Sequence, residues 1–139
     1  MKDLTKAGTR CLLIQPKISE FSSLNYIEVC KFAGSKYSTP QLGLLTVAAL
    51  LPQNWEFKLI DANVEPILDE HYEWADIVCS GGILSQQLEI FSIIEKVHSF
   101  GKKVLLGGPE PSSQSNYYLA EDYLIMGEGE DTIDRKSVV

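Results

Sequence analysis

The chain has 139 residues and a formal net charge of −7, with 45% hydrophobic and 22% charged residues. This composition is ordinary for one globular domain, large enough to bury about two-thirds of its unfolded surface. The negative charge argues against nucleic acid or an anionic membrane as a partner. No apolar run approaches the ~18 residues of a membrane span, and residues 1–10 are too polar for a signal peptide.

The three cysteines, Cys11, Cys30 and Cys79, are odd in number and widely spaced. Two of them lie inside apolar runs, so the pattern predicts buried thiols with neither a disulfide nor a metal site. Because free thiols persist in reducing compartments, we expect a cytoplasmic protein.

Taken in chain order, residues 1–9 form a polar lead-in, and residues 11–15 form an apolar first strand. Pro16 ends this strand, because proline cannot donate a ladder hydrogen bond. The connection over residues 17–39 is unusually long, so we expect it to be functional or to carry a short helix.

The next element is a helix over residues 40–51, with Ser38 or Thr39 as its N-cap. This helix is apolar nearly all round, which predicts that it is well buried. Gly43 in its first turn disfavours a helix by about 1 kcal/mol relative to alanine. Such a glycine indicates a close approach by backbone or ligand.

A second strand is expected over residues 55–61, a weak helical segment over 66–74, and a third strand over 76–80. Next comes an amphipathic helix that ends at Gly101. Its predicted buried face consists of Leu84, Leu88, Phe91, Ile94 and Val97.

A fourth strand follows at residues 103–106, and a fifth at 122–126. The two histidines, His71 and His98, are flanked by charged residues, so both are expected at the surface. Neither follows a strand, and we expect neither to bind a metal.

The alternation of strands and helices predicts an α/β fold with a parallel sheet and helices on both faces. Five strands favour the flavodoxin-like, doubly wound (Rossmann-like) order 2-1-3-4-5. Residues 10–133 would form this domain. Residues 134–139 would be the start of a further element or an appended tail.

Small and polar residues follow four of the five predicted strands. The carboxyl ends of parallel strands share one edge of the sheet, where open α/β folds bind ligands. The candidate binding residues at that edge are Asp61, Asn63, Ser80, Gly81, Gly82, Gly107, Gly108, Gly127 and Glu128.

The residues that follow the predicted strands exclude several binding sites that are common on such a sheet. A phosphorelay receiver needs acids after strand one and an aspartate after strand three, where this chain has Gln15 and Ser80. A dinucleotide fold needs G-x-G-x-x-G after strand one, and no glycine lies between Thr9 and Ala33. A P-loop is also absent. Residues 35–39 remain a loose candidate for an FMN phosphate loop.

Asp61, Ser80 and the pair Gly107-Gly108 match, in order, parts of three motifs: Asp-x-His-x-x-Gly, Ser-x-Leu and Gly-Gly. Here the chain resembles cobalamin-binding domains. The resemblance implies that the glycine pair leaves room for the nucleotide tail of the corrinoid and that the serine hydrogen-bonds its benzimidazole. Asn63 stands where that family has the cobalt-ligating histidine, so no histidine ligand is expected.

Two further differences separate the chain from those motifs. Pro66 replaces the last glycine of the first motif, and Gly82 replaces the leucine of the second.

These differences point to a subgroup of the family. Several other sequence blocks resemble the amino-terminal domain of cobalamin-dependent radical S-adenosylmethionine enzymes of the methyltransferase type. The matching blocks are residues 40–52, 61–66, 74–76, 107–109 and 127–130.

In those proteins the domain precedes a barrel whose Cys-x-x-x-Cys-x-x-Cys motif holds a 4Fe-4S iron–sulfur cluster and which uses S-adenosylmethionine. That motif is missing from this sequence. The resemblance therefore implies a non-catalytic, cobalamin-binding module of a larger protein. In that protein cobalamin would carry a methyl group from S-adenosylmethionine to a substrate carbon.

Two other functions stay open at this point. The domain could have lost its cofactor and serve as an interaction or substrate-presenting unit, or it could bind FMN or a nucleotide in the same crevice. The single residues also have simpler interpretations, with Asp61 and Asn63 as turn residues and Ser80 as a cap.

Overall fold

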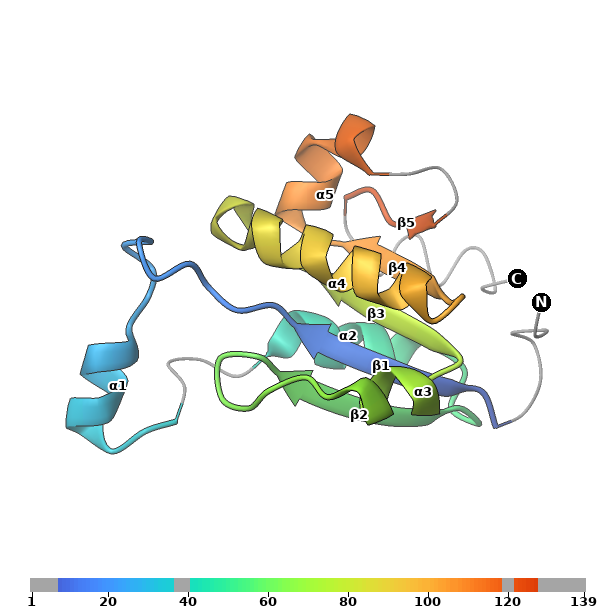
Figure 1. The fold of residues 1–139 in the computed structure, drawn as a ribbon, viewed down its shortest axis with the longest axis horizontal. Helices are drawn as coiled ribbons and strands as arrows, with labels where there is room; N and C mark the ends of the chain where they lie inside the picture. The colour runs from blue at the N-terminus through green and yellow to red at the C-terminus, as the bar shows by residue number, and fades with distance from the viewer. Residues whose placement is uncertain (1–7, 37–40, 119–121, 128–139) are drawn as a thin grey trace.

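The computed structural model describes residues 8–36, 41–118 and 122–127. They form a five-stranded, all-parallel sheet in the order β2-β1-β3-β4-β5, which confirms the predicted topology (Figure 1). The strands are β1 (Arg10–Gln15), β2 (Glu56–Asp61), β3 (Ile77–Gly81), β4 (Lys103–Gly107) and β5 (Tyr123–Leu124).

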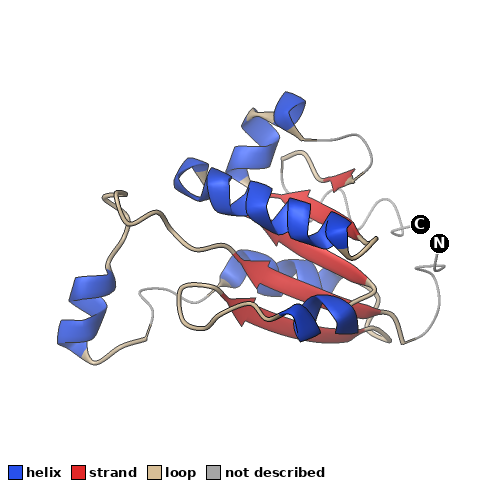
Figure 2. Ribbon diagram, viewed as in Figure 1, coloured by secondary structure: helices blue, strands red, loops and turns tan. Residues whose placement is uncertain are grey.

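Helices lie on both faces of this sheet, as expected for a doubly wound fold (Figure 2). They are α1 (Ile27–Ala33), α2 (Leu42–Leu50), α3 (Asp69–Trp74), α4 (Gln87–Ser99) and α5 (Pro109–Ser113). Two short 3-10 turns, η1 (Leu84–Gln86) and η2 (Ser115–Tyr117), follow β3 and α5. None of the described helices is long and apolar enough to cross a membrane.

The alternation of side chains along the strands produces two separate cores. Leu12 and Ile14 of β1 point to the face covered by α3 and α4, where they meet Tyr72 and Ile90. Cys11 and Leu13 point the other way, toward α2. Because successive strand residues face opposite sides, an apolar run such as β1 serves both cores.

The helix α2 is not buried as its composition predicted. It has no buried residue, and Leu42 and Leu45 are 65% and 46% exposed. Only the side with Leu44, Val47 and Leu50 contacts the sheet, so an all-round apolar helix leaves apolar side chains on its outer face. The predicted caps Ser38 and Thr39 lie outside the described residues, and Gln41 occupies the N-cap position instead.

The buried face of α4 was also predicted incorrectly at its amino end. Leu84 and Leu88 are 69% and 82% exposed. Leu84 lies in a 3-10 turn, whose pitch differs from that of the helix, and Leu88 lies in α4 on the side away from its buried residues. The residues of α4 that are buried are Ile90, Ile93, Ile94 and Val97.

His98 is less exposed than the sequence suggested. Its Nε2 lies 2.9 Å from a carboxylate oxygen of the buried Asp122, and its side chain is 28% exposed. This pair joins the end of α4 to the residue before β5. His71 is half-buried, and its Nδ1 accepts a hydrogen bond from the backbone of Leu68 at the start of α3.

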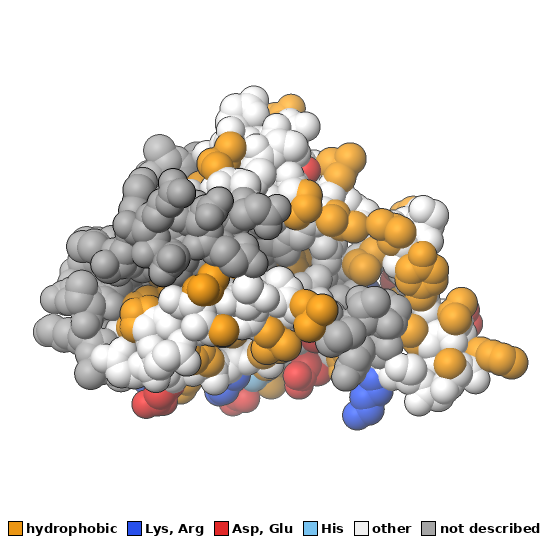
Figure 3. All heavy atoms as spheres, turned by 180° about the vertical axis from the view of Figure 1, so that it is seen from behind, with side chains coloured by type: hydrophobic (Ala, Val, Ile, Leu, Met, Phe, Trp, Pro, Cys, Tyr) orange, Lys and Arg blue, Asp and Glu red, His pale blue; other side chains and the backbone are white. Residues whose placement is uncertain are grey.

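The long connection after β1 carries the helix α1, as expected for a segment of this length. Figure 1 shows α1 at one end of the molecule, beyond the carboxyl edge of the sheet. No residue of α1 is buried, and Phe32 is 96% exposed. Figure 3 shows exposed hydrophobic side chains over α2 and toward the end of the molecule that carries α1.

Candidate functional site

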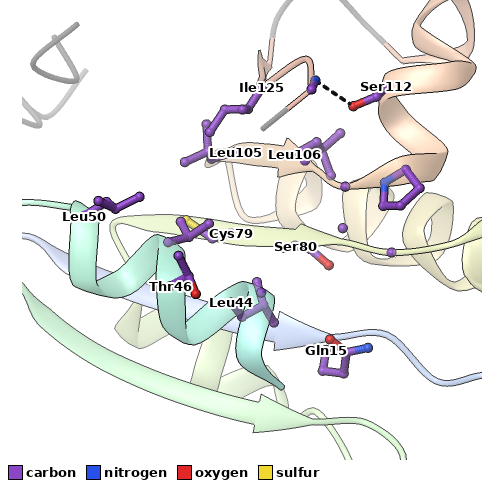
Figure 4. Close-up of a pocket in the computed structure, with 18 residues that line it drawn as sticks. Gln15, Leu44, Thr46, Leu50, Cys79, Ser80, Leu105, Leu106, Ser112 and Ile125 are labelled. Atoms are coloured by element: carbon purple, nitrogen blue, oxygen red, sulfur yellow. Dashed lines mark hydrogen bonds between the residues drawn. The ribbon is translucent and has the colours of Figure 1, made fainter. Parts of the chain in front are cut away.

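A cavity of about 490 Å³ opens at the carboxyl edge of the sheet, between α2 and the strands β3, β4 and β5 (Figure 4). We call it the edge cavity. Its walls are Leu44, Val47 and Leu50 on one side, and Cys79, Leu105 and Ile125 on the other. The volume lies within the range of small-molecule sites in proteins, roughly 300–1,000 Å³.

Glycines from two neighbouring strands form the mouth of this cavity. Gly81 and Gly107 are register partners, and a Cβ atom at Gly81 would collide with the Gly107 carbonyl oxygen. Gly108 has a φ of +93°, and its Cβ would lie 3.2 Å from the Gly82 backbone. Gly81 and Gly108 are therefore required by the close packing of two backbones.

Gly107 is different, because packing does not require a glycine there. A Cβ atom at Gly107 would meet only the Ile125 Cβ, at 3.8 Å, which is ordinary contact. Two residues earlier, Leu105 belongs to the core on the α2 side, so a side chain at Gly107 would point to the same side. Both Gly107 and Ile125 line the edge cavity, and the missing side chain leaves space in it.

Gly43 lines the same cavity from α2. A Cβ atom there would have no neighbour within 4 Å, and its φ is not in the left-handed region. The described structure thus contains no packing reason for a residue that disfavours the helix. No backbone approaches Gly43 among the described residues, so of the two predicted neighbours the ligand alone stays as a prediction.

The polar side chains of the edge cavity already bond to the protein. Ser80 Oγ donates to the Ile14 carbonyl at 2.9 Å, and Thr46 Oγ1 donates to the Leu42 carbonyl at 2.8 Å. Ser112 Oγ accepts from the Gly127 N–H at 3.2 Å. At the floor, the Cys79 and Cys11 sulfurs lie 3.4 Å apart, and both thiols are free.

The burial of these two thiols matches the prediction, whereas Cys30 is half-buried. The hydrogen bond with the Cys11 thiol, followed by burial, raises the pKa of the Cys79 thiol well above its usual value.

Asp61 and Asn63 do not line the edge cavity. The Asp61 carboxylate accepts hydrogen bonds from Gln41 Nε2 at 2.8 Å and from the Asn63 side chain at 2.8 Å. The Asn63 amide also donates to the Pro16 carbonyl at 3.2 Å and accepts from the Ile18 N–H at 2.9 Å. Two side chains thus tie together the loop after β1, the loop after β2 and the start of α2.

A second cavity, of about 450 Å³, lies between this hydrogen-bonded pair and α1. Asp61, Asn63, Tyr26, Ile27 and Cys30 are among the residues that line it. Gln15 lines both cavities, so they lie next to each other along the carboxyl edge.

The candidate residues therefore divide into two groups. Six of them surround the edge cavity, namely Ser80, Gly81, Gly82, Gly107, Gly108 and Gly127. Asp61 and Asn63 belong to the neighbouring cavity, and Glu128 lies outside the described residues.

One residue near the glycines was not identified from the sequence. Glu110 is only 2% exposed, and its carboxylate accepts hydrogen bonds from Gln87 Nε2 and from the Tyr118 hydroxyl. Its N–H donates to the Gly82 carbonyl at 2.9 Å. Glu110 thus holds the turn after β4 against the turn after β3. An acid directly after Gly-Gly-Pro was the available signal, but acids at helix starts are common.

Burial and the adjacent Glu110 carboxylate raise the pKa of Tyr118 far above its ordinary value. Within the described ranges, no three His, Cys, Asp or Glu side chains are grouped as metal ligands.

The sequence profile of the B12 binding domain matches residues 32–135. An uncharacterized methyltransferase of Synechocystis sp. is 36% identical over 126 residues, which cover 89% of this chain and 23% of that protein. The hopanoid C-2 methylase of Rhodopseudomonas palustris is 36% identical over 96 residues, 69% of this chain and 18% of that protein. The chain thus spans about a fifth of the length of these relatives.

Proposed function

Because the chain belongs to the B12-binding domain family, we propose that it is the cobalamin-binding module of a methyltransferase of the radical S-adenosylmethionine type. The observation that carries this proposal is the edge cavity. It opens beside Gly107, where packing does not require a glycine. The nucleotide tail of the corrinoid would enter this cavity, with its base between α2 and the sheet.

The residues around the cavity suit such a tail. Its flat, mostly apolar base matches walls of Leu44, Leu105 and Ile125. Gly43 and Gly107 leave space on two opposite sides, where a side chain would meet the base. To hydrogen-bond the ring nitrogen of the base, the Ser80 hydroxyl would have to rotate away from the Ile14 carbonyl, to which it donates in this structure.

The same proposal leaves cobalt without a nitrogen ligand from the protein. Asn63 stands where cobalamin-binding domains have their histidine, and both ends of its amide are bonded to neighbouring loops. An uncharged amide is also a poor ligand for cobalt in comparison with imidazole. We therefore assign Asp61 and Asn63 the role of holding the loops beside which the corrin ring would lie.

When bound, cobalamin would supply a carrier for a methyl group. The S-adenosylmethionine and the 4Fe-4S cluster that such chemistry needs would belong to a barrel elsewhere in the full-length protein. Two observations support a larger protein: the greater length of the relatives, and exposed apolar side chains on segments that follow the strands. Leu42, Val64 and Leu84 are such side chains, and a corrinoid with a neighbouring domain would cover them.

The test is a visible-absorption titration of the purified chain with hydroxocobalamin, with FMN and ATP as controls. We expect a saturable spectral change below about 100 μM, a free energy near −5.5 kcal/mol. Saturation with FMN and not with cobalamin would favour a flavodoxin-like function. Saturation with none of the three ligands would favour a domain that has lost its cofactor.

A further inference from the structure

We propose that the edge cavity distinguishes corrinoids by their lower base, accepting an apolar base such as a benzimidazole or a phenol and rejecting a purine. This inference rests on the proposed function, since it concerns which base the same cavity receives. It follows from the chemistry of the cavity walls.

The deep part of the cavity presents carbon and sulfur. Figure 4 shows Leu44 and Leu50 on α2 across from Cys79 and Leu105 on the strands, with Ile125 beside Leu105. The Cys79 thiol lies against Cys11, which is fully buried, so its nearest polar partner is another thiol. A base between these walls would lose water and gain few hydrogen bonds.

Few polar side chains of the described lining are available to a base. Thr46 bonds within its own helix, and Ser112 bonds to Gly127 near the mouth. Ser80 donates its one hydroxyl proton in a hydrogen bond to the Ile14 carbonyl. Gln15, the remaining polar side chain among the described lining residues, lies at the end of β1 next to the second cavity.

The three kinds of base place different demands on these groups. A benzimidazole released from cobalt has one free ring nitrogen, so burying it leaves at most one polar atom without a partner. A phenol has no ring nitrogen at all. Adenine adds an amino group and further ring nitrogens, and each polar group buried without a partner weakens binding by about tenfold or more.

The experiment measures the affinity of the chain for four corrinoids by visible-absorption titration. They are cobalamin, a cresolyl cobamide, an adeninyl cobamide, and cobinamide, which has no nucleotide tail. We expect cobalamin and the cresolyl cobamide to bind alike. The adeninyl cobamide should bind at least about tenfold more weakly, with an affinity near that of cobinamide.

The outcomes separate this inference from the proposed function. Equal affinity for the adenine and benzimidazole forms would overturn the inference while leaving the proposed function intact. Equal affinity for cobinamide and cobalamin would also overturn it, because the cavity would then not receive the tail. If no corrinoid binds, the proposed function itself fails.

A matched pair of variants tests the position of the base. Cys79→Ser and Cys11→Ser make the same change in two adjacent buried thiols, but only Cys79 lines the cavity. We expect the hydroxyl of Cys79→Ser to reduce the difference in affinity between the adeninyl cobamide and cobalamin. Cys11→Ser should leave that difference in affinity unchanged. An equal narrowing in both variants would contradict a base beside Cys79. If either variant fails to fold, the four-ligand comparison on the wild-type chain decides.

Discussion

Gly107 and Gly108 are neighbours in the sequence, yet a side chain at each would meet different surroundings. At Gly108, a side chain would require a left-handed backbone and would press on the Gly82 backbone at 3.2 Å. At Gly107, it would extend into the edge cavity with only Ile125 nearby. The motif Gly-Gly thus joins Gly108, which the fold requires, with Gly107, which packing does not require and to which we assign a role in binding.

We therefore expect Gly107→Val to prevent cobalamin binding and to leave the thermal midpoint nearly unchanged, because the added methyl groups occupy ligand space. Gly108→Val is the matched control, and it should destabilise the fold by about 1–3 kcal/mol through backbone strain. Thermal unfolding and cobalamin titration of both variants check this prediction. A Gly107→Val chain that binds cobalamin as tightly as the wild type would show that the tail does not pass this residue.

Gly43 permits a test in which stability and binding change in opposite directions. Gly43→Ala should stabilise α2 by about 0.5–1 kcal/mol, since alanine favours a helix and meets no neighbour here. It should also weaken cobalamin binding, because its methyl group enters the cavity.

The control for that prediction is Ala49→Gly, on the exposed side of the same helix. It should lose a similar amount of stability and leave the affinity unchanged. If Gly43→Ala were more stable with full affinity, the glycine would have no role in binding.

At the scale of single elements, Tyr72 connects α3 to the core. It also makes the stability of the folded chain fall at alkaline pH. Its ring stacks on Phe100 at 5.6 Å, and the side chain is buried. Burial, with smaller effects from the Glu89 and Asp69 carboxylates, raises the pKa of Tyr72 to about 12. The folded chain therefore keeps a phenol proton that the unfolded chain releases near pH 10.

The sign of the effect follows from this difference. The contribution of Tyr72 to stability is complete below pH 10 and is lost as the pH rises toward 12, with a slope below the ~1.4 kcal/mol per pH unit of a single proton. Tyr72→Phe should reduce this decline, leaving the part caused by Tyr118, whose pKa is also raised. Urea unfolding of both chains at pH 9 and pH 11.5 measures it. An equal decline in the two chains would refute the assignment to Tyr72.

The elements also show where sequence patterns were sufficient. Strand positions and the amphipathic helix α4 were predictable because they repeat with a clear period. The burial of α2 was not, because an all-apolar helix does not reveal which side meets the sheet. The exposure of Leu84 was not predictable either, because a 3-10 turn interrupts the helical period before α4 begins.

For the whole molecule, the order of the strands was predictable because parallel strands joined by helices require right-handed crossovers. This topology alone brings Ser80 and the glycines of β3 and β4 to one edge. The sequence could not separate them from Asp61 and Asn63, whose side chains bond to each other and to neighbouring loops. Such loop contacts depend on residues distant in the chain, for example Pro16 and Gln41. The burial of Glu110 likewise depends on tertiary contacts, with Gln87 and Tyr118.

The central claim is that this chain binds cobalamin with its benzimidazole withdrawn from cobalt and with no protein nitrogen in its place. Electron paramagnetic resonance of cob(II)alamin tests it directly, because a coordinated nitrogen splits each cobalt line into three. Free cob(II)alamin at neutral pH has this splitting from its own base. We predict that an excess of the chain abolishes the splitting while the cobalt lines remain. A splitting that persists in the presence of the chain would contradict the claim.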